Sequence, residues 1–434
     1  MNEVNKAVLF VGQSFYHFWY LSKELRKLGV KADVLDIGGA PNKDFYHGQD
    51  FELHFGSLKD KTDNLKFFLK AICQYDVFQF ANKGGLYFIS DFDYFSRRKI
   101  TYIENTIFKI IFWSIKKVCG TNPYRLCYLA NKLGFSNSYK LLQKFAGLLP
   151  ERWDIKLVKY FGVKVFYSMN GCTDGVSQTS FRKWETGTDK SVCDICSYSG
   201  NSKVCSDQGN LQWGKLRNEL CDYIFHPGNN EADYNISEVV KAFPSINCLD
   251  ENFWQPNMLI PTNYKINTKP DSIKIYHAVG DFDNRQTRGA TIKSTHIYLP
   301  LIERLISEGF NIELIFFKDI PSKKIKYYQA QADIIVDMLS YGAFGANIRE
   351  GLMLGKPCVC YLRPSWLTNM RKYNPEYVDE IPVLHADENS IYGILKDLIL
   401  NKEKRFEIGK KSREFAVKWH SSRVAASKYL KYLN

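Results

Sequence analysis

The sequence of 434 residues has no run of about 18 uncharged apolar residues, so it predicts no membrane-spanning helix. It lacks a signal-peptide pattern, because MNEVNKAVLFVG passes almost at once into an apolar strand. Its 11 cysteines are odd in number and scattered, which favours a reducing cytosol over a disulfide framework. No internal repeat or low-complexity tract is present. These absences predict a cytoplasmic globular protein, and the length predicts two domains.

Acidic residues are scarce in one stretch, residues 97–164, where fourteen Lys and Arg face only three acids, a formal excess of +11 within the chain's +13. The stretch includes TIFKIIFWSIKKVCG and SYKLLQKFAGLLP, which mix bulky apolar residues with lysines as helices in a membrane interface do. Two interpretations stay open: an insertion at about 97–155 that binds an anionic membrane surface, or the core of an enlarged first domain. Nucleic acid is not a predicted partner, because no recognised nucleic-acid motif accompanies the basic residues.

Short apolar runs alternate with helical patterns, as in the strands and helices of parallel sheets. In the first half the predicted strands are residues 7–11, 31–36, 75–81, 163–168 and 223–226, with a helix over 16–28. In the second half strands are predicted at 273–277, 312–317, 333–338, 357–362 and 381–384, with helices at 299–308, 324–331, 348–354 and 391–400. The predicted fold class is α/β, with two Rossmann-like doubly wound domains facing a cleft.

Composition also predicts where the domains meet. Residues 1–253 form the predicted N-terminal domain, and residues 273–414 the predicted C-terminal domain. Residues 254–272 between them contain three prolines and many polar residues, which are typical of a linker.

The segment YGAFGANIREGLMLGKP, which begins at Tyr341, follows a predicted strand and so occupies a carboxyl-end turn of the second domain. Gly342 and Gly345 permit backbone conformations and close approaches that a Cβ would block. The amides from Phe344 to Asn347, together with the helix dipole, predict a seat for phosphate. Glu350, about one turn into the helix, suits paired ribose hydroxyls because a carboxylate accepts two hydrogen bonds. A tight turn with a solvated Glu is the alternative.

A neighbouring turn of the same domain carries DNRQTRGATIKSTH, in which Arg288 and Lys293 are separated by four residues. Such a pair converges on one diphosphate and neutralises the charge that grows as a sugar–phosphate bond breaks. Two unrelated solvated cations are the alternative interpretation.

With these motifs the chain resembles the retaining glycosyltransferases of family 4, which have the two-domain GT-B fold. The family's Arg-x4-Lys pair is matched by Arg288 and Lys293, and its EGFGxxxxEAMAxGKPV segment by GAFGANIREGLMLGKPCV. Glu350 matches the second Glu of the family's Glu-x7-Glu motif, whereas the first falls on Gly342. The tail FEIGKKSREFAVKWHSSRVAASKYL is similar to the family's last helices, so a helix at about 415–434 is expected to cross back onto the first domain.

The resemblance implies transfer of a sugar, with retention, from a nucleotide sugar to a glycan or lipid-linked acceptor. It places the reaction in cell-surface polysaccharide or glycolipid assembly, lipopolysaccharide included, on the inner face of the membrane. No cofactor or metal is required for catalysis, because the departing diphosphate deprotonates the acceptor and the protein supplies positioning and charge. A sugar-nucleotide epimerase and a non-catalytic relic that binds glycan or nucleotide, the latter suggested by Gly342, are the alternatives.

Other residues are expected to border the cleft. Asp174, in MNGCTDG, is a candidate for binding sugar or acceptor, with a turn-forming Asp as the alternative. Donor binding is expected to involve the first glycine turn, the ends of the second domain's strands and the YGAFGAN segment: Gly12, Gln13, His277, Asp337, Tyr341, Phe344, Gly345, Ala346 and Asn347.

Four cysteines have a spacing that suits a structural zinc ion. Cys193 and Cys196 form a Cys-x2-Cys pair, Cys205 follows, and Cys172 lies upstream in the same polar region. Four thiolates close a tetrahedral site and stabilise a loop that has little core. Cys221 is an alternative fourth ligand, and reduced cysteines without metal are the other interpretation.

Overall fold

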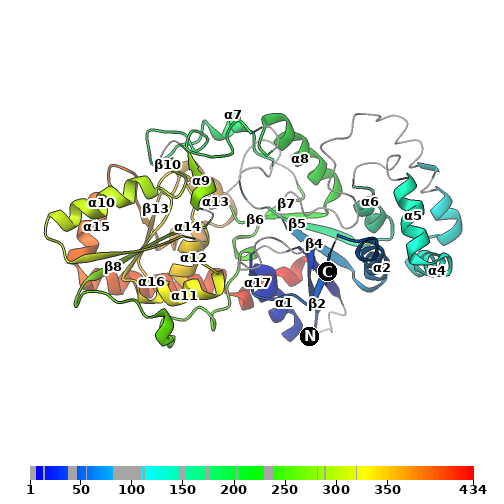
Figure 1. Cartoon of the computed structure of the whole chain (residues 1–434), viewed down its shortest axis with the longest axis horizontal. Helices are drawn as coiled ribbons and strands as arrows, with labels where there is room; N and C mark the ends of the chain where they lie inside the picture. The colour runs from blue at the N-terminus through cyan, green and yellow to red at the C-terminus, as the bar shows by residue number, and fades with distance from the viewer. Residues whose placement is uncertain are drawn as a thin grey trace.

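The computed structural model shows two parallel β-sheets accompanied by helices (Figure 1). This arrangement confirms the predicted α/β class with two doubly wound domains. Within the described residues no helix is both long and apolar enough to cross a bilayer. The described residues are 6–12, 15–37, 46–54, 56–81, 109–110, 113–145, 152–169, 171, 175–201, 204–228, 238–280, 282–287, 290–318 and 320–434.

The first sheet, as far as the structure describes the chain, has seven parallel strands in the order β3-β2-β1-β4-β5-β6-β7. Its strands are β1 Ala7–Val11, β2 Lys31–Ile37, β3 Phe51–Leu53, β4 Val77–Ala81, β5 Lys164–Ser168, β6 Tyr223–His226 and β7 Val240–Ala242. The two edge strands, β3 and β7, were not predicted, because three residues are too few to show a period.

Helices connect these strands and extend the first domain beyond its sheet (Figure 1). They are α1 His17–Lys27, α2 Leu58–Gln74, α4 Pro123–Leu133, α5 Phe135–Phe145, α6 Trp153–Tyr160, α7 Gln178–Phe181 and α8 Asp207–Leu220, followed by the 3-10 turns η6 Pro244–Ile246 and η7 Thr262–Tyr264. Helix α2 begins with a capping box, in which Ser57 Oγ accepts from the Asp60 amide at 3.1 Å and Asp60 accepts from the Ser57 amide at 2.7 Å.

The second sheet is also parallel, in the order β11-β8-β12-β13-β14. Its strands are β8 Ile273–Val279, β11 Ile312–Lys318, β12 Ile334–Val336, β13 Cys358–Cys360 and β14 Leu384–His385, with a separate antiparallel pair of β9 Gln286–Thr287 and β10 Ala290–Thr291. The helices are α9 Phe282–Arg285, α10 Thr295–Ser307, α11 Ser322–Gln331, α12 Ala346–Met353, α13 Pro364–Tyr373, α14 Pro375–Asp379, α15 Ile391–Leu400, α16 Lys402–His420, α17 Ser422–Tyr429 and the 3-10 turn η8 Leu430–Tyr432.

The end of the chain returns to the first domain, and α17 packs against α1 (Figure 1). At the return point, the Leu249 amide donates to the carbonyl of His420 at 2.8 Å, and the Ser422 amide donates to the carbonyl of Leu249 at 2.8 Å. Further on, the Tyr429 hydroxyl donates to Gln79 Oε1 at 3.0 Å within the first domain. Backbone and side-chain hydrogen bonds therefore tie the end of the chain to the first domain.

One hydrophobic core is continuous between the domains. It includes Phe10 and Tyr16 from the first domain, Tyr276 and Phe344 from the second, and the fully buried Trp254 between them. Two further clusters lie within the first and the second domain. A shared apolar core excludes water from the junction, where the polar groups of the candidate site are found.

Candidate functional site at the domain junction

Lys293 and Asp337 form an ion pair at the carboxyl end of the second sheet. The Lys293 ammonium donates to Asp337 Oδ1 at 2.8 Å and to Oδ2 at 3.1 Å. Asp337 is completely buried, and the Lys293 side chain is slightly exposed, so the lysine is the outer member of the pair. An ammonium has three N–H donors, which leaves Lys293 the capacity to hold a further acceptor.

Gly345 brings bare backbone next to this pair. It is the N-cap of α12 and has no side chain to cap the helix, so the first amides of α12, starting at Ala346, receive no side-chain cap from it. A Cβ at Gly345 would lie 3.5 Å from Asp337 Oδ2 and 3.6 Å from the Lys293 ammonium. A helix N-terminus and a lysine therefore meet at one point, an arrangement that favours a phosphate.

Asn347 and His277 make hydrogen bonds at this end of the second sheet. Asn347 donates through Nδ2 to the carbonyl of Ala278 at 3.1 Å, which ties α12 to the end of β8. His277 is fully buried, with Nε2 2.9 Å from Thr295 Oγ1. Burial lowers the pKa of His277 to about 4, so it is neutral at physiological pH. The structure thus places His277 beneath the site, among groups that already satisfy its ring nitrogens.

Glu350 joins the two domains. It is buried, and one carboxylate oxygen accepts a hydrogen bond from the hydroxyl of Tyr16, in the first βα turn of the N-terminal domain. The other oxygen accepts from Gln329 Nε2 at 2.8 Å. Tyr16 follows β1 and Glu350 follows β12, so the carboxyl-end turns of the two sheets face each other. Each oxygen of the carboxylate that is predicted for ribose hydroxyls therefore already accepts one hydrogen bond from the protein.

Burial controls the protonation of this contact. It raises the pKa of Glu350, while the hydrogen bonds from Tyr16 and Gln329 and the charge of Arg349 oppose the shift. Burial also raises the pKa of Tyr16 well above its usual range, and the Glu350 charge adds to that effect. The phenol therefore stays protonated and acts as the donor.

Arg349, the neighbour of Glu350, points into a small cavity between the domains. The cavity is lined by Pro227, Pro244, Ala343, Phe344, Arg349, Trp366, Tyr377 and His420. Arg349 donates through Nη1 to the carbonyl of Phe344 at 3.3 Å. Burial, followed by the Arg349 charge, lowers the pKa of His420 well below its usual range, so this imidazole remains neutral. Arg349 and Glu350 are thus two buried ionisable side chains that are adjacent on one helix.

Gly342 occupies the position of the family's first motif Glu, and the structure gives a physical reason for the glycine. Its φ of +85° lies in the left-handed region, and a Cβ there would lie 2.4 Å from Arg363 Cβ. Arg363 is buried, and its guanidinium lies 3.5 Å from the centre of the Trp184 ring. The space that a motif carboxylate would need is therefore filled by Arg363.

A segment of the N-terminal domain covers this side of the second domain. The Glu388 amide donates to the carbonyl of Gly187 at 2.6 Å, and Ser365 Oγ donates to Glu185 at 2.7 Å. A Cβ at Gly187 would lie only 2.2 Å from the carbonyl oxygen of Leu339, so only glycine permits this approach. Sequence analysis missed this contact, since residues 185–187 carry no recognised motif.

Other predicted residues are placed as follows. Tyr341 and Phe344 are buried, with the Tyr341 ring 5.7 Å from that of Phe181 and the Phe344 ring 5.8 Å from that of Trp366. Gly12 has a φ of +76° at the end of β1, as its turn requires. Gln13, Asp174, Arg288 and Cys172 lie outside the described residues.

The structure brings three of the predicted zinc ligands into one region. Cys193 is buried, and burial raises its pKa to about 11, with smaller contributions from Cys196 and Cys205. Cys205 Sγ accepts from Gln178 Nε2 at 3.3 Å and from Asn210 Nδ2 at 3.4 Å. Among the described residues, no group of three or more potential ligands could hold a metal ion. The zinc site stays a prediction, which metal analysis of the purified protein tests.

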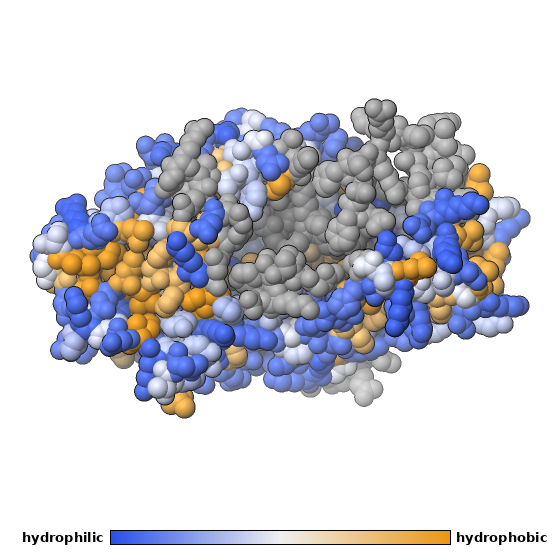
Figure 2. Space-filling view, viewed as in Figure 1, coloured by the Kyte–Doolittle hydropathy of each residue, from blue (hydrophilic) through white to orange (hydrophobic). Residues whose placement is uncertain are grey.

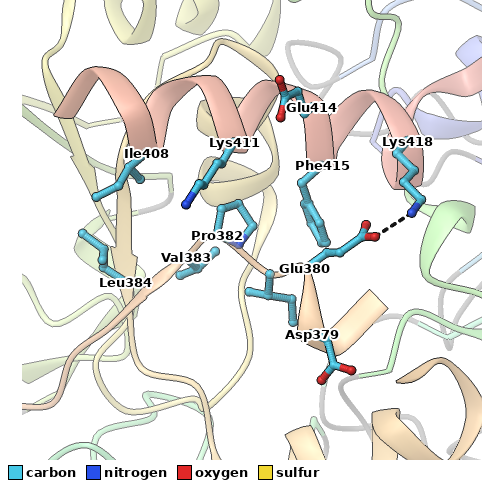
Figure 3. Close-up of a pocket in the computed structure, with 11 residues that line it drawn as sticks. Asp379, Glu380, Pro382, Val383, Leu384, Ile408, Lys411, Glu414, Phe415 and Lys418 are labelled. Carbon is cyan, nitrogen blue, oxygen red and sulfur yellow. Dashed lines mark hydrogen bonds and ion pairs between the residues drawn. The ribbon is translucent and has the colours of Figure 1, made fainter. Parts of the chain in front are cut away.

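A separate pocket lies between α16 and residues 379–384 (Figure 3). Its volume is about 630 Å³. Apolar side chains, including Val383 and Phe415, form one part of its lining, and Lys418 pairs with Glu380 at 2.6 Å beside them. None of the predicted site residues lines this pocket, so it carries no weight in assigning the reaction.

Comparison with known proteins gives likeness of structure only. No protein-family model matches the sequence. No curated protein sequence matches it. Similar solved structures include a sucrose-phosphate synthase of Thermosynechococcus elongatus, with 12% identity, coverage of 99% of this chain and 98% of that chain, and a TM-score of 0.49.

Two further structures are similar over 99% of both chains. One is HepE of Anabaena in complex with UDP-glucose, with 11% identity and a TM-score of 0.46. The other is the UDP-GlcNAc 2-epimerase of Neisseria meningitidis bound to UDP-GlcNAc, with 12% identity and a TM-score of 0.44. At such identities a fold does not assign an activity. The two parallel-sheet domains, whose carboxyl-end turns meet at Tyr16 and Glu350, have the predicted GT-B arrangement.

Proposed function

We propose that this protein is a glycosyltransferase that takes a sugar from a nucleotide-sugar donor. The observation that carries the proposal is the meeting of Lys293 with the uncapped N-terminus of α12 at Gly345, on the same helix as Glu350. Lys293 and the α12 amides would hold the donor diphosphate, together with Arg288 as the motif implies. Glu350 would hold the ribose, because a carboxylate accepts two hydroxyl hydrogen bonds.

The finer assignment follows the resemblance to family 4. We propose transfer with retention to a glycan or lipid-linked acceptor in the assembly of a cell-surface polysaccharide or glycolipid, in the cytoplasm. The protein would supply positioning and positive charge, while the departing diphosphate takes the acceptor's proton on the same face of the sugar. No cofactor is part of this proposal.

Donor binding requires a change at the junction. Glu350 is buried and each of its oxygens already accepts one hydrogen bond from the protein, so a ribose would reach it only if surrounding groups such as Tyr16 moved. Tyr16 belongs to the other domain, and a small separation of the domains would free its oxygen. In this proposal the structure would be a closed state, in which protein groups surround the oxygens that are proposed to bind the ribose.

Thermal stabilisation by a panel of nucleotides and nucleotide sugars tests the proposal. A ligand at about one hundred times its dissociation constant adds about 2.7 kcal/mol to the free energy of unfolding. The matched variant is Lys293→Gln with Asp337→Asn, which removes the ammonium without leaving a buried carboxylate unpaired. We expect one nucleotide family to stabilise the native protein and not this variant. Equal stabilisation of both proteins would show that Lys293 does not contribute to nucleotide binding.

One alternative is a non-catalytic binding protein, which the blocked Gly342 position favours. Glu350→Gln separates it from an enzyme. In an enzyme this variant lowers sugar transfer to an acceptor extract sharply and weakens nucleotide binding. In a protein that only binds glycan, no nucleotide stabilises either form. In a protein that only binds nucleotide, a nucleotide stabilises the native chain, and in both cases no transfer is measured with the native chain. An epimerase has less support, because His277 is buried and hydrogen-bonded.

A further inference from the structure

Exposed apolar side chains are concentrated at one end of the molecule. Of the nineteen large hydrophobic side chains that are exposed among the described residues, eight lie between residues 110 and 141. They are Ile110, Trp113, Val118, Tyr124, Tyr128, Leu129, Leu133 and Leu141. This end carries α4 and α5, far from the second sheet (Figure 1), and hydrophobic atoms there alternate with hydrophilic ones (Figure 2).

Helix α4 shows the arrangement in detail. Tyr124, Tyr128 and Lys132 are four residues apart and are all exposed, so they form one row along the helix. Leu129 and Leu133 belong to the adjacent row, again four residues apart. Tyr128 is 64% exposed and Leu133 52% exposed. Aromatic, aliphatic and cationic side chains thus share the outward face of one helix.

The inward faces of the same helices are already packed. Leu126 and Ala130 of α4 and Phe135 and Leu142 of α5 pack against the core of the first domain. Both helices contact α2. The alternative that this segment is domain core therefore explains the inward residues, and the outward rows stay in contact with solvent.

Positive charge surrounds the exposed rows. Residues 109–145 contain seven Lys and Arg and no Asp or Glu. The Lys117 ammonium lies 4.0 Å from the centre of the Trp113 ring, so the cation and the aromatic face are presented together. Lysines bury their methylene stems along apolar surface while the ammonium stays in a polar layer.

We propose that this surface, defined as the helical residues 113–119 with α4 and α5 and called the outer helical surface, docks on an anionic lipid bilayer. Aromatic and aliphatic side chains of such a surface enter the headgroup–acyl boundary, and lysines bind lipid phosphates. This inference is independent of the proposed transfer reaction, because it uses none of the residues at the domain junction.

Charge and composition favour lipid over other partners. A second copy that docked through the same surface would place six cations against six cations, which costs energy. Nucleic acid would use the lysines and stack on Trp113 or Tyr128, but it gives no role to the exposed Val118, Leu129 and Leu133. A bilayer with anionic headgroups satisfies both the cations and the aliphatic side chains.

Flotation of the full-length protein with vesicles tests the inference. We expect binding to phosphatidylcholine vesicles that contain phosphatidylglycerol, weak binding to pure phosphatidylcholine, and a loss of affinity as salt rises. Lys116→Gln, Lys132→Gln and Lys140→Gln together should lower affinity on the order of a hundredfold, at about fivefold for each lysine.

The matched control places the same kinds of change in the second domain. Trp113→Gln, Tyr128→Gln and Leu133→Gln should abolish flotation, whereas Leu400→Gln with Phe406→Gln, where Phe406 is 70% exposed, should not. Native protein that stays at the bottom with anionic vesicles at low salt would overturn the inference. Equal losses of vesicle binding in the two sets of variants would also overturn it. So would the finding that the native protein forms dimers or binds DNA without lipid, and that the same three substitutions abolish this dimerisation or DNA binding. Nucleotide stabilisation without lipid, measured on the same variants, reports the proposed transferase site separately.

Discussion

The domain junction and the outer helical surface differ in whether their charged and apolar side chains are paired within the protein or exposed to solvent. At the junction, Lys293 is paired with Asp337, and Glu350 is paired with Tyr16 and Gln329. On the outer helical surface, the lysines have no acidic neighbour in sequence and the large apolar side chains face water. The ionisable groups named at the junction are paired with protein groups, so a ligand there must replace some of these contacts. The outer helical surface exposes cations and apolar side chains that an external partner can cover.

The comparison also separates two kinds of binding. A ligand at the junction competes with existing protein contacts, so its affinity includes the free energy needed to break them. A bilayer at the outer helical surface would cover side chains that are already exposed to solvent. Conditions that loosen the junction should therefore strengthen nucleotide binding and leave lipid binding unchanged.

The largest expected effect is that of pH on the junction and the core around it. Burial lowers the pKa of His17 to about 3 and of His226 and His277 to about 4. These histidines take up protons in the unfolded chain near pH 6.5, so stability is lost as pH falls from about 6.5 toward 4. Each of these histidines lowers the free energy of unfolding by about 2 kcal/mol at pH 5 relative to neutral pH. The raised pKa of Glu350 acts in the opposite direction, because the folded state takes up a proton at Glu350 as pH falls.

Urea midpoints measured between pH 7 and pH 5 check this expectation. The variant His277→Gln keeps a polar group near Thr295 and removes one titrating ring. The free energy of unfolding of this variant should fall less between pH 7 and pH 5, by about the contribution of one histidine. A midpoint that does not change with pH would contradict the buried, neutral histidines.

Breaking the buried ion pair comes next. Lys293→Gln alone leaves Asp337 buried without its cation, which should cost about 3–5 kcal/mol of unfolding free energy. The double variant with Asp337→Asn should recover most of that loss. Chemical denaturation of the native protein and both variants measures the difference. Equal stability of the single and double variants would show that Asp337 has another partner.

Gly342→Ala tests the filled motif position. It combines the cost of a left-handed backbone with overlap on Arg363 and should destabilise by about 3 kcal/mol. Gly29→Ala is the matched control, because Gly29 has a φ of +83° and no atom within 4 Å of an added Cβ. The control should cost about 1 kcal/mol. Similar melting temperatures for the two variants would mean that Arg363 moves aside freely.

Tyr16→Phe gives the smallest stability change and the sharpest test of competition. Removing a hydrogen bond to a charged group should cost about 1.5–3 kcal/mol, while nucleotide affinity should rise because one Glu350 oxygen becomes available. Tyr20→Phe is the control, since the Tyr20 hydroxyl lies 2.5 Å from His47 and not at Glu350. Calorimetric titration with the nucleotide found by the panel measures the nucleotide affinity of the two variants, and chemical denaturation measures their stability. Weaker binding by Tyr16→Phe would mean that Tyr16 contacts the ligand.

Much of the architecture was predictable from the sequence for a physical reason. Buried parallel strands are apolar runs, so β1 and β6 agree with the predicted 7–11 and 223–226. The approach of Lys293 to Gly345 follows from the same logic, since both lie in turns at the carboxyl ends of neighbouring strands. Strands of three residues, such as β3 and β7, give too little pattern to recognise.

The partners of Glu350 were not predictable. Tyr16 lies 334 residues away in sequence, and the contact depends on how the domains close, which no local pattern records. Gln329 lies on a different helix, α11, and glutamine has no motif there. The departure at Gly342 was visible in the sequence, but its cause is the position of Arg363, which only the folded chain shows.

The paired backbone at Leu249 constrains how the cleft can open. The chain passes between the domains once in each direction, and the two passages are joined side by side through Leu249 to His420 and Ser422. Two adjacent connections that are joined by backbone hydrogen bonds resist twisting of one domain against the other more than a single connection would. A separation of Tyr16 from Glu350 must therefore either keep the pairing at Leu249 or break both of its hydrogen bonds.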